Sequence, residues 1–364
     1  MQRSEDLGVT AAGGEGRHDF ADLVKGFGIF LVVWGHTMVP RSVYIYSFHM
    51  PLFFFISGYL HRERPLGGFV VHKLNRLYVP YAVFSLLSWL FYLGDLLLRH
   101  EQNLAAGHLV KLVSVISGTA RNGGNDSIWF LPCLLVVGVL HLALARLGRP
   151  RFILPAAAAL SVLGYALGVN RFLLPFKIDV ALLALPFYAL GHLCRRGDLP
   201  ARLDRLRPAP LAAALIAAEI LHVATASLNV RVAGIQKVAM ISNTVGDYFL
   251  FYLSALAGVA VFVTLGYKIG RLRWLNYLGI NSLLLLACHK PLLYLLARAA
   301  RGLNLFDPHA PPFGFLMSLL VTASVMPLAR PCNKHLPWLV GKGSLFAPRA
   351  SARAANEREG NDIT

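Results

Sequence analysis

The chain has 364 residues and a formal net charge of +17, and 56% of its residues are hydrophobic. A mean hydropathy of +0.56 excludes an ordinary soluble domain. Several apolar runs reach the roughly 17 to 25 residues that a membrane-spanning helix needs. We therefore predict an all-α integral membrane protein, a bundle of about ten transmembrane helices with both termini in the cytoplasm.

The positive charge is spread over short segments between the apolar runs. This distribution argues against a nucleic-acid-binding protein, because such proteins gather their charge on one face or arm. Membrane topology explains the excess better, so we expect the lipid bilayer as a partner and no nucleic acid. The cysteines, Cys133, Cys194, Cys288 and Cys332, lack the spacing of a metal site or a disulfide framework. We expect structural thiols and no bound metal.

The domain organisation follows from the ends of the chain. Residues 1–18 are polar without an apolar core, which predicts a disordered N-terminal tail and no cleaved signal peptide. Residues 19–330 form the predicted transmembrane domain. Residues 331–364 predict a basic cytoplasmic C-terminal tail, whose last part is rich in Ala, Arg, Gly and Glu.

Ten predicted spans fill the transmembrane domain. They cover residues 20–40, 44–60, 78–98, 128–146, 152–169, 179–195, 210–228, 247–267, 274–297 and 312–329. With the N-terminus inside, the inner segments carry more than twice as many Lys and Arg residues as the outer segments. This bias predicts a multi-pass protein of the cytoplasmic (inner) membrane with both ends inside.

Two histidines lie in the first predicted helical hairpin, where a membrane does not normally tolerate them. His36 and His49 lie at equal distances on either side of the turn around Pro40 and Arg41, so we expect their rings at one depth. Lys25 precedes His36 by eleven residues, which is three helical turns plus about 20°. The two residues should share one helix face, about 16 Å apart along the axis.

A neutral histidine can accept a proton from an attacking hydroxyl, which is the task of a general base. The alignment with Lys25 and the depth shared with His49 favour this role for His36 over that of a buried histidine bonded to a carbonyl. For His49 the alternatives stay open. A hydrogen bond that locks the hairpin is as plausible as a second catalytic role or a role in orienting a substrate.

The first inner loop carries a basic cluster that includes Arg62, Lys73 and Arg76. By itself the cluster is the usual excess of positive charge on the inner side. On a helix, however, Lys73 and Arg76 are three residues apart and point the same way, so together they would bind a phosphate. With Lys25 they would form a cationic inner mouth for an anionic, phosphate-bearing ligand.

Polar residues also lie at the outer ends of later spans. Asn125, Asp126 and Trp129 stand at the edge of the fourth span. A tryptophan there is usually an interfacial anchor, and the alternative is a sugar site built by stacking and hydrogen bonding.

His289 and Lys290 lie about 22 Å from the inner end of the ninth span, in its outer half. A charged Lys290 inside a span needs a partner, which Asp247 or Asp179 would supply. We favour a functional role for this pair. No role is assigned to Asp95, His141, His192, Glu219 and His222, which lie near predicted ends or on poorly defined spans.

Four motifs occur in order along the first 140 residues. They are DFADLVKGFGIFLVVWGH, FHMPLFFFISGYL, FVVHKLNRLYVPY and SIWFLPCLLVV. This series resembles the membrane acyltransferase-3 family, in particular its fucose 4-O-acetylase-like branch. The family's first span carries a basic residue, ten intervening residues and a histidine, which correspond to Lys25 and His36. The basic residue is often arginine in the family, and its basic pair in the first inner loop corresponds to Lys73 and Arg76.

The resemblance implies transfer of an acyl group, usually acetyl from acetyl-CoA, to a hydroxyl of a cell-surface polysaccharide or lipid-linked sugar. Acetyl-CoA would be a cosubstrate, with no tightly bound cofactor and with glycan-assembly proteins as further partners. Its phosphates would lie at Lys25, Arg62, Lys73 and Arg76, and its thioester would reach His36. His36 would act as general base while His49 or His289 orients the acceptor or polarises the thioester. A transient acetyl group on His36 is an alternative.

Two other classes of protein stay open. In a transporter or flippase, the residues His36, His49, Asp247, His289 and Lys290 would form an intramembrane relay. Such a protein would need no CoA site, and it often shows repeated halves, of which the sequence gives no clear sign. A structural subunit of a glycan-synthesis complex has no positive signal in the sequence.

Overall fold

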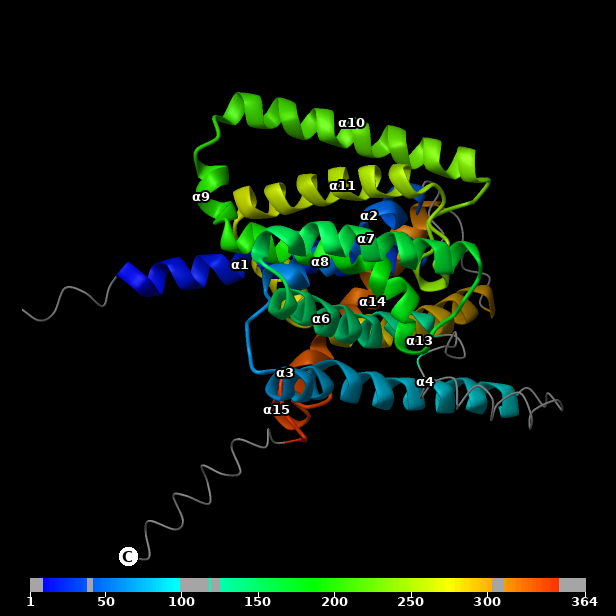
Figure 1. Cartoon of the computed structure of the whole chain (residues 1–364). Helices are drawn as coiled ribbons and strands as arrows, with labels where there is room; N and C mark the ends of the chain where they lie inside the picture. Colours follow the sequence, from blue (N-terminus) through cyan, green and yellow to red (C-terminus); the bar gives the residue numbers. More distant parts are fainter. Residues whose placement is uncertain (1–8, 38–41, 99–117, 119–124, 303–310, 347–364) are drawn as a thin grey trace, which may run out of the picture. The chain divides into compact units, whose positions relative to one another are not determined.

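The fold is that of a computed structural model, in which the structure describes residues 9–37, 42–98, 118, 125–302 and 311–346 (Figure 1). Helices account for the regular structure, and within these residues there is no β-strand beyond an isolated bridge between Ala239 and Thr244. The predicted all-α class is therefore confirmed. The four cysteines form no disulfide bond in this part of the chain.

The chain divides into two compact units, residues 1–60 with 186–326 and residues 61–185 with 327–364. The first unit holds α1 (Val9–Gly35), α2 (Ser42–Tyr59), α9 (Leu199–Asp204), α10 (Pro208–Ala233), η4 (Met240–Ser242), α11 (Tyr248–Ile269), α12 (Arg273–Ile280), α13 (Ser282–Gly302) and α14 (Pro311–Val325). The second unit holds α3 (Leu66–Lys73), η1 (Leu74–Tyr78), α4 (Val79–Leu98), η2 (Asp126–Trp129), α6 (Phe130–Leu147), α7 (Pro150–Val169), η3 (Pro175–Lys177) and α15 (Ala329–His335). Helix α8 (Ile178–Arg196) and η5 (Met326–Leu328) cross the division.

Eight helical segments of the described chain are long and apolar enough to cross a bilayer. They are Leu66–Leu98, Asp126–Leu147, Pro150–Val169, Pro175–Arg196, Pro208–Ala233, Tyr248–Ile269, Ser282–Gly302 and Phe313–His335. Each overlaps one of the ten predicted spans. The two remaining predictions correspond to α1 and α2, which are helical but less apolar, because five charged residues in α1 and the Ser, Tyr and His residues of α2 interrupt their apolar runs. These two helices carry Lys25, His36 and His49.

The predicted ninth span, residues 274–297, is wrong as a single helix. It consists of α12 and α13, which meet at Asn281, where φ is −110° and ψ is 19°. The break has a physical cause, because α12 is held closely against α1. Gly26 lies against the backbone of Leu275, and Gly279 lies against the backbone of Asp22. The count that placed His289 about 22 Å from an inner helix end therefore fails, since His289 is about 10 Å from the start of α13.

Asn276 reinforces this contact between α12 and α1. Its Nδ2 donates to the Asp19 carbonyl at 2.6 Å, while its Oδ1 accepts from the Leu272 backbone N–H at 2.9 Å. The same side chain therefore caps the start of α12 and ties it to α1. This pairing sets the position of the helix that carries His36.

The ends of the domain also differ from the prediction. The backbone of α1 is already helical from Val9, within the predicted tail 1–18. In the second unit, part of the predicted tail 331–364 is folded onto Asn75. The Asn75 Oδ1 accepts from the backbone N–H groups of Leu345 and Phe346 at 2.7 and 2.9 Å, and its Nδ2 donates to the Phe346 carbonyl at 2.9 Å. A single buried amide thus satisfies three backbone groups and anchors this segment.

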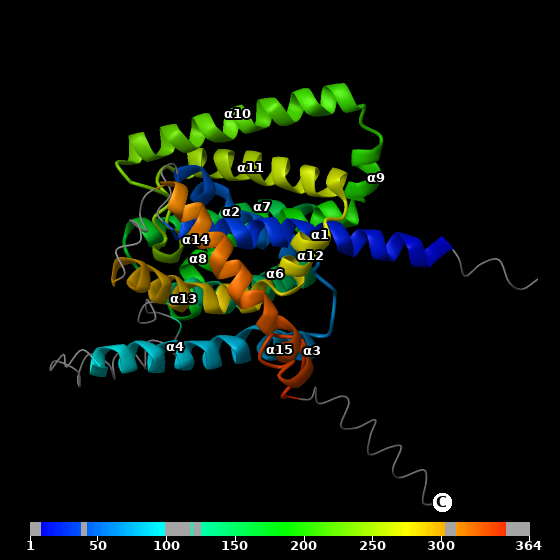
Figure 2. The same cartoon turned by 180° about the vertical axis from the view of Figure 1, so that it is seen from behind.

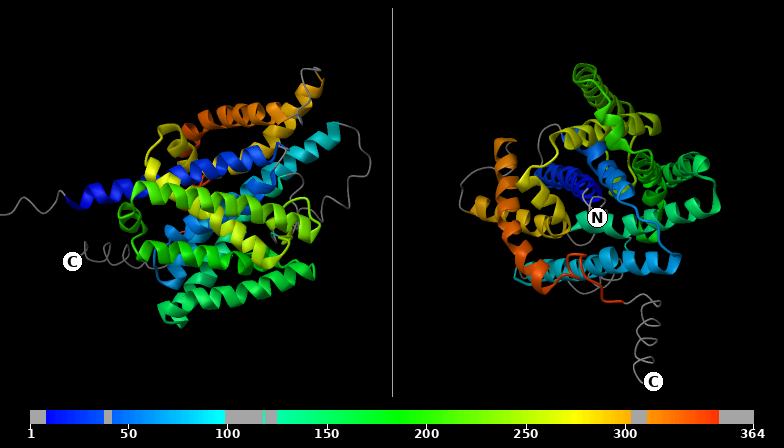
Figure 3. Two further views of the ribbon diagram at one scale, coloured as in Figure 1. Left: turned by 90° about the horizontal axis from the view of Figure 1, so that it is seen from above. Right: turned by 90° about the vertical axis from the view of Figure 1, so that its left-hand side faces the viewer.

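Helices α10 and α11 lie side by side in the first unit (Figures 1 and 2). Local signals set their ends. Helix α10 starts at Pro208 and stops before Gly234, which takes the left-handed conformation with φ 63°. Asp247 caps α11, because its carboxylate accepts from the Leu250 N–H at 2.9 Å. The amber α13 and the orange α14 are a second neighbouring pair (Figure 3).

The core of the first unit joins α1, α2 and α11. Phe20, Phe48, Phe55 and Tyr59 are almost fully buried there and pack against valines of α11. The Phe48 ring stacks on Phe262 with centroids 4.5 Å apart. This apolar layer fixes α1 against α2 and so positions the polar residues near the C-terminal end of α1.

Substituting Gly279 tests the packing of α12. We expect Gly279→Ala to lower the stability of the purified protein by roughly 1–3 kcal/mol, because the added Cβ would overlap the Asp22 carbonyl. Gly67→Ala is the matched control. Gly67 faces open space, so helix propensity alone should make that change neutral or slightly stabilising. Thermal unfolding in detergent measures both, and equal effects in the two variants would contradict the proposed contact.

Candidate active site

His36 lies directly after the last residue of α1. The helix ends at Gly35, five residues before the predicted end of the first span, although the His36 N–H still bonds to the carbonyls of Val32 and Val33. The chain is therefore helical from Lys25 up to His36, so the helical spacing predicted between these two residues applies. The ring of His36 is partly exposed and stands at the end of the helix, so it is not in the middle of a span.

Tyr46 of α2 fixes the orientation of the His36 ring. The Tyr46 hydroxyl lies 3.1 Å from His36 Nδ1 and 3.3 Å from the Gly35 carbonyl. A hydroxyl carries one proton, and a carbonyl can only accept. Both contacts are satisfied when the hydroxyl donates to Gly35 and accepts from the Nδ1–H of His36. The neutral ring then has its lone pair on Nε2.

His289 stacks on His36. The ring centroids are 5.3 Å apart and the planes differ by 27°. His289 is fully buried in α13, and its Nδ1 donates to the Leu285 carbonyl at 2.9 Å. The structure thus brings together two histidines that are separated by more than 250 residues in sequence.

His49 completes the group through Tyr46. The rings of Tyr46 and His49 are 5.0 Å apart, and His49 Nδ1 donates to the Ile45 carbonyl at 2.7 Å. We call His36, Tyr46, His49 and His289 the histidine cluster. In this tautomeric arrangement, each of the three imidazoles carries its proton on Nδ1 and presents Nε2 as an acceptor. The cluster can therefore take up a proton and orient a hydroxyl.

Two lysines belong to the segments that meet at the cluster. Lys290 directly follows His289 in α13. The Lys237 ammonium lies 4.0 Å from the centroid of the Tyr46 ring, a cation–π contact.

Sequence reasoning missed both Tyr46 and Lys237. The signal for Tyr46 was present, since it lies three residues before His49 on one helix face. Lys237 lies in the connection between α10 and α11, where helical periodicity gives no information.

Lys25 has a partner on its own helix. Its Nζ lies 2.6 Å from Asp22 Oδ1, and both side chains are less than a quarter exposed. An anionic ligand at Lys25 would have to share it with Asp22. Asp247, a predicted partner of Lys290, uses its carboxylate to cap α11.

The predicted basic residues of the first inner loop lie in the second unit. Arg62 and Arg76 are exposed, whereas Lys73 is partly buried, with its Nζ 5.4 Å from the centroid of Phe69. The backbone from Leu74 to Tyr78 is a π-helix. Each residue of a π-helix turns through a smaller angle about the helix axis than a residue of an α-helix. A separation of three residues therefore no longer predicts that Lys73 and Arg76 point the same way. Their binding of phosphate stays a prediction.

The predicted sugar-binding residues are also in the second unit. Asn125 is fully buried and donates to the Ser88 hydroxyl at 2.8 Å. Trp129 is 7% exposed, which contradicts the expectation of an interfacial anchor, because the ring packs inside the unit. Asp126 starts the short helix η2. Asp179, the other predicted partner of Lys290, is buried in this unit and accepts from the Leu174 N–H at 3.3 Å.

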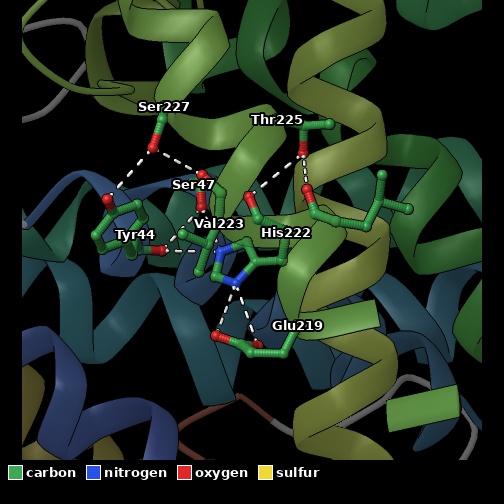
Figure 4. A network of polar contacts seen from close by, with 8 residues as sticks. Tyr44, Ser47, Glu219, His222, Val223, Thr225 and Ser227 are labelled. Atoms are coloured by element: carbon green, nitrogen blue, oxygen red, sulfur yellow. Dashed lines mark hydrogen bonds and ion pairs between the residues drawn. The ribbon is translucent and has the colours of Figure 1, made fainter. Parts of the chain in front are cut away.

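A second polar network joins α2 to α10 (Figure 4). The Ser47 hydroxyl lies 2.8 Å from His222 Nε2, and both carboxylate oxygens of Glu219 lie 3.4 Å from His222 Nδ1. These are the residue types of a serine–histidine–acid triad. Ser47, however, is fully buried and its hydroxyl is 2.8 Å from the Tyr44 carbonyl, to which it donates. The network therefore holds α2, with Tyr46 and His49, against α10.

Comparison with known proteins gives one result for the whole domain. A family model described as an acyltransferase domain, that of the acyltransferase-3 family, matches residues 18–330. The matched range includes the histidine cluster and the basic inner loop. No curated protein and no solved structure gives a significant match to the chain.

The network between α2 and α10 can be tested with two buried serines. We expect Ser47→Ala to lower the free energy of unfolding by about 1 kcal/mol more than Ser318→Ala does. The difference should appear as a lower midpoint of thermal unfolding in Ser47→Ala. Both serines are fully buried and donate to a carbonyl of their own helix, but Ser47 also contacts His222. Equal shifts in the two purified variants would show that the contact with His222 contributes nothing.

Proposed function

The chain belongs to the acyltransferase-3 family, and we propose that it moves an acetyl or other acyl group from acyl-CoA to a hydroxyl of a cell-surface polysaccharide or lipid-linked sugar. The observation that carries this proposal is the histidine cluster, in which the Tyr46 hydroxyl contacts both Nδ1 of His36 and the Gly35 carbonyl. Within the family, the motifs around Lys25 and His49 favour the fucose 4-O-acetylase-like branch.

In the proposed step, the acceptor hydroxyl attacks the thioester carbonyl carbon. Nε2 of His36 takes the hydroxyl proton as the new C–O bond forms. When the tetrahedral intermediate collapses, the C–S bond breaks and the proton passes from His36 to the leaving thiolate. The products are the sugar ester and CoA with a free thiol, so no other reactant is needed.

The neighbours of His36 support this role. Tyr46 accepts the Nδ1–H and would stabilise the imidazolium that forms during the reaction, as the third member of a catalytic triad does. His289 stacks on the same ring and would orient the acceptor or polarise the thioester carbonyl. His49 would act through Tyr46, whose ring it contacts.

The donor site is proposed from the basic residues. Lys25 lies about 16 Å along α1 from His36, at the predicted cytoplasmic end, and a phosphate of CoA would share it with Asp22. Within the second unit, Arg62, Lys73 and Arg76 are proposed by themselves as a group that binds phosphate. The pantetheine arm would then extend toward His36.

Removing the proposed base is the first test. We expect His36→Gln to lower acetylation of the cell's glycans by roughly 10²- to 10⁴-fold at equal abundance of the protein in the membrane. His335→Gln serves as the control, because His335 is exposed and lies beyond the matched domain. Mass spectrometry of the released glycans gives the acetyl content. Full acetylation in the His36 variant would rule out the mechanism, and uptake of a substrate without CoA would favour a transporter.

The role of Tyr46 is tested by removing one oxygen. We expect Tyr46→Phe to lower kcat roughly 2- to 10-fold, because a hydrogen bond of about 1 kcal/mol no longer fixes the His36 tautomer. Tyr44→Phe is the matched control on the same helix, since the Tyr44 hydroxyl accepts from Ser227 and does not belong to the cluster. Steady-state acetyl transfer by the purified protein measures both. An unchanged kcat in Tyr46→Phe would show that Tyr46 does not position the base.

A further inference from the structure

The connection between α10 and α11 brings a positive charge to the histidine cluster. Lys237 lies in this connection, and its ammonium is 4.0 Å from the centroid of the Tyr46 ring. Its neighbour Val238 is 1% exposed and Met240 is 3% exposed, so both are buried anchors. Lys237 is therefore held by a packed segment and is not a solvated surface lysine.

Asn229 fixes the backbone of this connection. Its buried side chain donates from Nδ2 to the Val245 carbonyl and accepts at Oδ1 from the Asp247 N–H, both at 2.8 Å. Gly246 has φ 83°, and a Cβ at this position would overlap the Asn229 side chain. Together with the bridge between Ala239 and Thr244, these contacts give the connection one conformation.

A second lysine lies on another helix that reaches the cluster. Lys290 of α13 directly follows His289, whose ring stacks on His36. Asp247, the carboxylate at the end of the connection, caps α11 through the Leu250 N–H. The Lys237 ammonium thus lies against the histidine cluster, and a positive charge at this place favours an anionic group on the ligand.

We propose that the acceptor sugar carries a negative charge, a carboxylate or a phosphate, which Lys237 and Lys290 bind while His36 takes the proton of a neighbouring hydroxyl. This inference rests on the proposed function and adds the chemical class of the acceptor. A uronic acid supplies a carboxylate, and a sugar linked to a lipid or to another sugar through phosphate supplies a phosphodiester. Both present the same chemistry to an ammonium group, namely charged oxygen acceptors.

Binding of matched sugars tests the proposal. The probes are methyl glucuronide, glucose 1-phosphate and methyl glucoside, and their dissociation constants are measured by saturation-transfer NMR on the purified full chain in nanodiscs. We expect one or both anionic probes to bind at least about tenfold more tightly than methyl glucoside. In Lys237→Gln this preference should be lost, and Lys237→Arg should retain most of it. Lys334→Gln is the control, because Lys334 is exposed on α15.

Each outcome decides one question. Preference for methyl glucuronide indicates a uronic acid, and preference for glucose 1-phosphate indicates a phosphate. Equal binding of the neutral probe, no binding of any probe, or the same preference in Lys237→Gln overturns the inference. A rise in the KM for acetyl-CoA in Lys237→Gln, with sugar binding unchanged, would assign the lysine to the donor and also overturn it. Failure of the proposed function shows separately, as the absence of acetyl transfer by the wild-type protein.

Discussion

The contact between the Tyr46 hydroxyl and His36 Nδ1 is the interaction on which the site depends. It connects the end of α1 to the start of α2, and the second contact of the same hydroxyl, to Gly35, determines where the imidazole carries its proton. Without it, the neutral ring could place its proton on either nitrogen. The rest of the first unit serves this geometry. Aromatic packing fixes α1 against α2, Gly26 and Gly279 hold α12 against α1, and the Ser47–His222–Glu219 network holds α2 against α10.

Much of this arrangement could be predicted from the sequence because it depends on local spacing. Apolar runs predict helices wherever a bilayer is the solvent, and eight of the predicted ranges overlap helices that are long and apolar enough to span it. His36 and His49 were expected at one depth from their distances to a single turn, and the structure places both rings next to Tyr46. The family motifs extended this reasoning to the function, and the acyltransferase match covers residues 18–330.

Other features depend on contacts between distant segments and leave no local pattern. The break at Asn281 follows from the close packing of α12 on α1, so hydropathy alone gave one continuous span from 274 to 297. Lys237 reaches the cluster only because the buried Asn229 folds the connection between α10 and α11. Similarly, one amide on the π-helical turn, Asn75, orders residues that composition assigned to a tail.

The central claim is that the reactive end of the acyl donor reaches the ring of His36. Chemical footprinting tests it directly, by treating the purified protein with diethyl pyrocarbonate and quantifying each modified histidine by mass spectrometry with and without CoA. The account predicts that saturating CoA slows modification of His36, which is partly exposed, and leaves the exposed His335 unchanged. Equal rates of modification at His36 with and without CoA would contradict it.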